Sequence, residues 1–203
     1  MTRSQVVVIG MGTGLRCDDG IGPVVASLIA QWRIPGVSVE VSEGEPTRLM
    51  DLWTGADLAV VVDAVVCEPA SPGRVLRIDT ARLRRAPAAA GSHCLGLAET
   101  VALGDALGRR PGTLVILGVE AVCLDTGVGL SPPVASAVPV VIEAVLADIA
   151  RWAPLRDTSG RFRDPSFFVA RIPNPTGPTR GQLQPNGTPP APRPNSRYCR
   201  MPC

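Results

Sequence analysis

An aspartate interrupts the most apolar stretch of this chain. Asp63 follows the apolar run 58–62 and precedes three further apolar residues. An ionised carboxylate inside such a run is costly unless it is paired with a cation or bound to a metal ion. We therefore interpret Asp63 as a functional acid. The alternatives are a surface acid just beyond a strand end, or an acid paired with an arginine.

Two further aspartates and the only histidine precede segments of helical character. Asp18 and Asp19 lie near the end of a glycine-rich loop, where one of them could cap the next helix and the other lacks a structural explanation. At the start of a helix the backbone dipole keeps the imidazole of His93 neutral and able to bind a metal, although a lone histidine is more often a surface or core residue. If these segments meet Asp63, one or two carboxylates and an imidazole would suit nickel, zinc or iron rather than calcium.

Strands and helices alternate along the chain, which predicts how these segments could meet. Runs of β-branched or alternating apolar residues predict five strands, at 5–9, 37–41, 58–62, 74–78 and 113–117. Helical spacing predicts helices at 23–32, 47–53, 94–107 and 132–152. The order predicts an α/β fold, a three-layer αβα sandwich around a mostly parallel five-stranded sheet, with the fourth strand at an edge. Ligands of such sheets bind beyond the carboxyl ends of the strands, where Asp63 and the glycine-rich loop fall.

The glycine-rich loop also raises the possibility of a dinucleotide site in an oxidoreductase. Gly10 and Gly12 follow a strand, but the third glycine of the fingerprint is replaced by Leu15. Asp18 and Asp19 would repel a pyrophosphate in this loop. The sequence also lacks the G-x-S-x-G, HExxH and P-loop motifs, which disfavours serine hydrolases, zincins and nucleotide hydrolases.

The chain of 203 residues is long enough for one domain and an appendage. We assign the domain to residues 1–153. Residues 154–203 contain 11 Pro, 8 Arg and 2 Asp, a composition that predicts a disordered, basic tail. The arginines are scattered and few aromatic residues lie between them, so we expect no nucleic-acid partner.

Composition also indicates the environment of the protein. The N-terminus lacks a signal-peptide pattern, and no uninterrupted apolar run reaches the length of a membrane helix. The six cysteines form no CxxC pair, which argues against a zinc ribbon or a disulfide scaffold. We expect a soluble, cytoplasmic, monomeric protein without a membrane partner.

Several motifs, in order and at compatible spacing, resemble the hydrogenase maturation endopeptidases, which process the large subunit of nickel-iron hydrogenases. The resemblance spans about residues 5–152 and is carried by IGMGTGLRCDDGIG at 9–22, EGEPTRL at 43–49, VDAV at 62–65, PG at 72–73, SHCLGL at 92–97 and GLSP at 129–132. Thr13, Gly14 and Cys17 depart from the Asn, Pro and Gly that are frequent in the family.

The resemblance implies an aspartic-type endopeptidase that removes a C-terminal extension from the large-subunit precursor after nickel insertion. It implies that Asp19, Asp63 and His93 are catalytic metal ligands, completing the coordination of nickel that the precursor supplies on its own cysteines. Glu43 is a further candidate catalytic residue, as an assisting acid, with a solvated loop residue as its alternative. Water could be activated by the ion as a Lewis acid or by a carboxylate as general base. The alternative function is a non-catalytic nickel-binding hydrogenase assembly factor.

Overall fold

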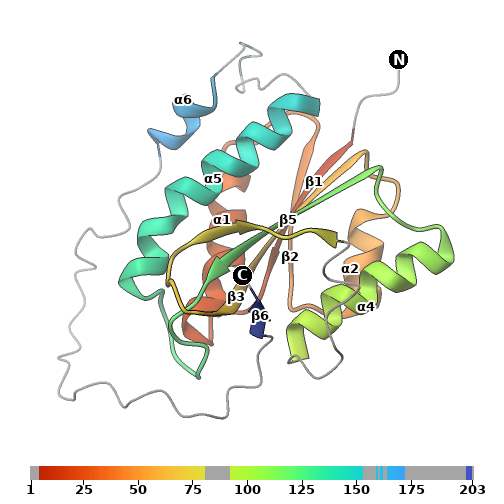
Figure 1. Cartoon of the computed structure of the whole chain (residues 1–203). Helices are drawn as coiled ribbons and strands as arrows, with labels where there is room; N and C mark the ends of the chain where they lie inside the picture. The colour runs from red at the N-terminus through yellow and green to blue at the C-terminus, as the bar shows by residue number, and fades with distance from the viewer. Residues whose placement is uncertain are drawn as a thin grey trace, which may run out of the picture.

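The computed structural model describes the chain in several ranges, which together cover most of the domain. They are residues 5–80, 92–152, 159, 161, 164–171 and 200–202, with 92–96, 169 and 200–202 described by backbone alone. Figure 1 shows a sheet with helices on both of its faces.

Five strands form the sheet in the order β2-β1-β3-β5-β4. They are β1 (Val6–Met11), β2 (Val37–Ser42), β3 (Leu58–Glu68), β4 (Val75–Arg77) and β5 (Thr113–Glu120). All pair in parallel except β4, which lies at an edge, antiparallel to β5. The five-stranded, mostly parallel sheet and its edge strand are therefore confirmed. A short strand, β6 (Arg200–Pro202), pairs with the far end of β3 at Val66–Glu68.

Helices cover the two faces of the sheet and bury the central strands. They are α1 (Ile21–Ala30), α2 (Pro46–Trp53), α4 (Ser92–Leu107) and α5 (Pro132–Trp152), and a short 3-10 helix, η1 (Cys17–Gly20), precedes α1. Side chains alternate across a strand, so Val60 and Val62 of β3 pack in the cluster formed with α1 and α5. Ala59 and Val61 pack on the opposite face, in the cluster formed with α2 and α4. These two clusters are the two interfaces of a three-layer αβα sandwich.

Helix α1 crosses β1 at a point where both elements carry glycine. A Cβ added at Gly10 would lie 2.2 Å from the carbonyl oxygen of Gly22, and one added at Gly22 would lie 2.1 Å from that of Met11. No side chain fits between backbones at this separation. These two glycines therefore permit close packing of the helix on the strand.

Helix α5 is long and apolar enough to cross a membrane by length and composition. The sequence predicted no such segment because Glu143 and Asp148 interrupt the apolar residues of this helix. Half of its most apolar window is buried within the protein, and Asp148 forms an ion pair with Arg77 of β4. We therefore assign α5 as a core helix.

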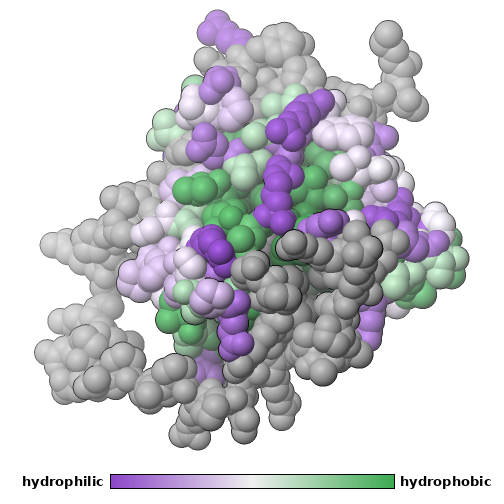
Figure 2. Space-filling model, in the orientation of Figure 1, coloured by the Kyte–Doolittle hydropathy of each residue, from purple (hydrophilic) through white to green (hydrophobic). Residues whose placement is uncertain are grey.

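On the side viewed in Figure 2, apolar residues gather in the middle of the surface and hydrophilic side chains cross them.

Part of the region expected to be disordered is helical. Within 154–203, α6 (Pro165–Val169) begins after Asp164, whose carboxylate accepts a hydrogen bond from the N–H of Ser166. Phe168 is 2% exposed and lies in the core cluster, with its ring 5.2 Å from that of Trp32. The difference arises because two adjacent phenylalanines supply apolar area that the overall composition of the region conceals.

Candidate functional site

Asp63 lies within the central strand, beyond the point where β1 turns away. The pairing of β1 with β3 ends at Gly10, which lies opposite Val62. Asp63 is the next residue of β3, and on the other side of the strand it pairs with Gly118 of β5. The side chain is 3% exposed and accepts a hydrogen bond of 2.9 Å from the N–H of Ala64. Burial and, as a smaller effect, the negative charge of Asp19 together raise the pKa of Asp63 to about 7, and the Ala64 hydrogen bond acts in the opposite direction.

Asp19 supplies the second carboxylate of the pair. It lies in η1, is 2% exposed, and its Oδ2 accepts a hydrogen bond of 2.9 Å from the N–H of Thr13. Its repulsive effect on Asp63 requires that the two side chains lie near each other. Among the side chains that the structure describes, no arginine forms an ion pair with either acid. The two carboxylates are therefore buried without a compensating cation in the described part of the protein.

Asp18 has a different role from its neighbour. Its Oδ2 accepts hydrogen bonds from the N–H groups of Val122 and Cys123 and from the Ser131 hydroxyl, and its Oδ1 accepts one from the Ser131 N–H. Neither Asp18 nor Asp19 caps α1, whose N-cap is Gly20 without a side-chain hydrogen bond. The interpretation that one of the pair caps this helix is wrong. Asp18 instead anchors η1 to the segment between β5 and α5.

The anchoring role of Asp18 was not predicted, because no residue near it in the sequence indicates this role. Its partners lie more than a hundred residues further along the chain. The one available signal was Ser131 before Pro132, which correctly marked the start of α5. There the Ser131 hydroxyl donates to Asp18.

His93 and Glu43 approach the same end of the sheet through their backbones. His93 lies in the first turn of α4, and its side chain falls outside the described part of the chain. Because α4 leads back to the start of β5, its first turn lies toward the carboxyl ends of the strands, on the face that Asp63 shares with Val61. Glu43 follows β2 and is exposed. The role of each in catalysis stays a prediction.

The carboxylate pair can bind a cation but does not complete a site by itself. No group of three or more His, Cys, Asp or Glu suited to a metal occurs among the residues that the structure describes. Two carboxylate oxygens and one further ligand would leave positions open for ligands brought by a substrate. The fit of the pair to a cation rests on its buried, uncompensated charge.

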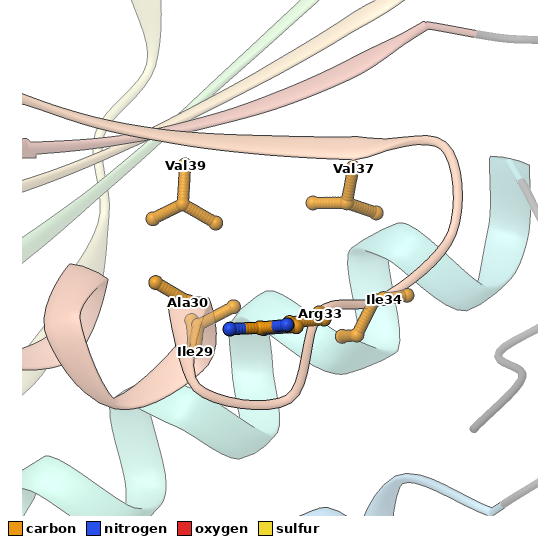
Figure 3. Close-up of a pocket in the computed structure, with 6 residues that line it drawn as sticks. All are labelled: Ile29, Ala30, Arg33, Ile34, Val37 and Val39. Carbon is orange, nitrogen blue, oxygen red and sulfur yellow. The ribbon is translucent and has the colours of Figure 1, made fainter. Parts of the chain in front are cut away.

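A separate cavity lies at the opposite end of the sheet. It measures about 230 Å³ and is lined by residues of α1, β2 and the turn between them (Figure 3): Ile29, Ala30, Arg33, Ile34, Val37 and Val39. Val37 pairs with Val6 at the amino ends of the strands, far along the sheet from Asp63. No carboxylate lines the cavity, so it is not part of the site.

Comparisons with known proteins agree on one family. The hydrogenase maturation protease family model, HycI, matches residues 24–148, a range that includes Asp63 and His93. The hydrogenase 2 maturation protease of Escherichia coli K12 is 28% identical over 149 residues, which cover 70% of this chain and 89% of that protein. The hydrogenase expression/formation protein HupD of Bradyrhizobium diazoefficiens is 28% identical over 155 residues, covering 73% and 80%.

A solved structure agrees with these matches. The hydrogenase maturating endopeptidase HybD from Escherichia coli is 26% identical, has a TM-score of 0.61, and overlaps 72% of this chain and 93% of its own. The resemblance inferred from the sequence motifs is confirmed. Because the family model matches more than half of the chain, this protein belongs to the hydrogenase maturation proteases, a family of endopeptidases and therefore of hydrolases.

Proposed function

We propose that this endopeptidase removes the C-terminal extension of a nickel-iron hydrogenase large-subunit precursor after nickel has been inserted. The single observation that supports this most is the buried carboxylate pair of Asp19 and Asp63, for which no arginine among the described side chains compensates. Burying two such charges is unfavourable until a cation arrives. In this proposal the compensating cation is the nickel of the precursor, which is part of the substrate.

In this proposal Asp19, Asp63 and His93 complete the coordination of nickel that precursor cysteines already hold. The Thr13 N–H orients Asp19, and the Ala64 N–H orients Asp63. With a pKa of about 7, Asp63 carries a proton in about half of the molecules at neutral pH, and ligation of a cation would release that proton. Metal-free precursor would bring no such compensation, so nickel would act as a test of readiness.

The attack of water on the scissile peptide would be assisted in one of two ways. The ion would polarise the scissile carbonyl, or a carboxylate would accept a proton from the water. A carboxyl with a pKa near 7 is suited to proton transfer at neutral pH, but ligation of the ion would lower that pKa. Asp63 would therefore be the base only where it is not a ligand of the ion, and the exposed Glu43 is the alternative base. Replacing Glu43 with Gln is expected to leave processing within about threefold of the native rate if Asp63 is the base. The proposed reaction takes place in the cytoplasm, with one copy of the chain acting on one precursor.

The experiment compares nickel-loaded and metal-free precursor, with cleavage followed by electrophoretic mobility. The native chain is expected to cut only the loaded precursor, and the Asp63→Asn variant to cut neither. Asp51→Asn is the matched control, because Asp51 is exposed and forms a surface ion pair with Arg109. Equal cutting of both precursors would contradict the role of nickel.

The second candidate, a non-catalytic assembly factor, is separated by the same experiment. A chain that binds loaded precursor without shortening it would support docking alone. The Asp19→Asn variant would then weaken binding of the loaded precursor and have no cleavage to lose.

A further inference from the structure

Two free cysteines from separate segments meet beside η1. Cys17 is the first residue of η1 and Cys123 follows β5, and both are partly buried. Burial, as the largest effect, and the neighbouring Cys123 side chain raise the pKa of the Cys17 thiol to about 11, which requires that the two side chains lie near each other.

The backbone holds the two cysteines in this position. The Cys17 N–H donates to the Gly127 carbonyl at 2.9 Å, and the Asp18 N–H donates to the Cys123 carbonyl at 3.0 Å. The second bond joins the peptide unit that follows Cys17 to the carbonyl group of Cys123, so the backbone holds the two cysteines next to each other. Gly127 also leaves room for the Cys17 sulfur, since a Cβ added there would lie 2.6 Å from it.

Cys17 occupies a backbone conformation that disfavours it. Its φ of +46° lies in the left-handed region, where glycine is at ease and a side chain is strained. The backbone therefore gives no reason for a cysteine here, and what the side chain contributes is a thiol near Cys123.

We propose that Cys17 and Cys123 form a reversible disulfide that tethers η1 to the segment between β5 and α5. The oxidant is a low-molecular-weight disulfide of the glutathione class. One cysteine sulfur attacks its S–S bond, forms a mixed disulfide and releases one thiol. The second cysteine sulfur attacks the mixed disulfide at the protein sulfur and releases the second thiol. The cysteine pair loses two electrons, the oxidant gains them, and the two cysteine protons pass to the released thiols.

The tether would act on the segment that carries Asp19. It would join the same two segments that the carboxylate of Asp18 joins, and close a loop of roughly a hundred residues. Such a crosslink restricts the unfolded chain and the local opening of η1. This inference stands apart from the proposed function, because neither the bond nor its test requires peptidase activity.

The experiment equilibrates the native full chain in glutathione buffers of graded redox ratio. Free thiols are then alkylated, and crosslinks are mapped by mass spectrometry, which also keeps the disulfide of Cys67 separate. We expect a peptide pair joined through Cys17 and Cys123 that dithiothreitol reverses. The oxidised chain is expected to have a Tm higher by about 5–10 °C.

Cys17→Gly is the most informative variant, since glycine suits the φ of this position and the change removes the side chain with its thiol. It is expected to abolish both the crosslink and the rise in Tm. Gly14→Ala is the matched control from the same loop, because nothing lies within 4 Å of the added Cβ and every cysteine is kept, and it should retain both. Alkylation of Cys17 and Cys123 at every redox ratio, their capture as separate mixed disulfides, or a crosslink without a rise in Tm would overturn the proposal.

Discussion

The adjacent residues Asp18 and Asp19 have different roles, the first in anchoring the fold and the second at the candidate site. All the hydrogen bonds that the Asp18 carboxylate accepts come from residues 122–131, whereas the Asp19 carboxylate accepts one from Thr13 and lies near Asp63. A fully satisfied carboxylate is stabilising, whereas a carboxylate near a like charge is not. The first acid therefore supports the fold, and the second is available to a ligand.

Matched amide variants test this division. Asp18→Asn replaces an acceptor oxygen with an NH₂ group that faces donors, so we expect a loss of about 2–4 kcal/mol in the free energy of unfolding. Asp19→Asn keeps an oxygen for the Thr13 N–H and relieves repulsion with Asp63, so its stability should stay within about 1 kcal/mol. Urea denaturation measures both. Equal losses in the two variants would show that the roles are not divided.

The raised pKa of Asp63 predicts how stability depends on pH. In the folded protein the pKa is about 7, against an ordinary value of 3.8, so the folded state keeps a proton that the unfolded state releases. Stability contributed by this proton is fully present below about pH 4 and is lost as the pH rises through 7. Asn cannot ionise, so we expect the Asp63→Asn variant to be more stable than the native chain at pH 8, by about 2–4 kcal/mol.

Denaturation at pH 4, 6 and 8 checks this prediction. The difference between the two chains should shrink toward pH 4, because the native Asp63 is then protonated in both states. A variant more stable at pH 8 that no longer processes precursor would show stability traded for activity. A difference that is independent of pH would contradict the raised pKa.

The sequence identified these acids unequally, for a physical reason. An acid within the apolar run of β3 is anomalous by itself, so Asp63 could be singled out without a structure. Asp18 and Asp19 have the same chemistry and the same neighbours in the sequence. Only the distant partners of Asp18 distinguish them, and a contact of this range has no local signature.

At the scale of elements, the crossing of α1 over β1 is a close backbone contact near the site. The glycines at this crossing let η1 and α1 follow β1 closely, which sets Asp19 above the end of the sheet. The sequence drew attention to Gly10 because it follows a strand. It could not distinguish packing from anion binding, because both need glycine after a strand.

Alanine substitutions measure this contact. Gly22→Ala would place a Cβ 2.1 Å from the Met11 carbonyl oxygen, so we expect a loss of at least about 3 kcal/mol or an insoluble chain. Gly14→Ala is the control from the same loop, where nothing lies within 4 Å, and should change stability by less than about 0.5 kcal/mol. Similar melting temperatures for both variants would show that the crossing can relax.

For the whole molecule, the alternation of strands and helices was sufficient to predict three layers and a mostly parallel sheet. Periodicity reports which side of an element is buried, so it recovers the layers. It does not report which distant segment covers a given surface. The docking of α6 beside Trp32 was accordingly not predicted, because a composition rich in proline and arginine outweighed two phenylalanines.

Truncations test the contribution of α6 to the whole domain. A chain that ends at Arg171 is expected to be more stable than one that ends at residue 153 by about 2–4 kcal/mol, because Phe168 is buried. Phe168→Ala in the full chain should reproduce most of this loss, whereas Leu107→Ala, at an exposed position, should not. Thermal unfolding monitored by circular dichroism compares these four variants with the native chain. Equal stability of the two truncated chains would mean that α6 adds nothing.

The internal anchoring of the η1 loop frees its outer surface to evolve. Leu15 is 67% exposed and Val128 is 86% exposed, and they flank the backbone bond between Leu15 and Gly127. Because the buried Asp18 carboxylate holds this loop in place, these two exposed positions can be randomised in a combinatorial library with little effect on folding. Measuring the stability of the library members by thermal unfolding would show how far these exposed positions tolerate substitution.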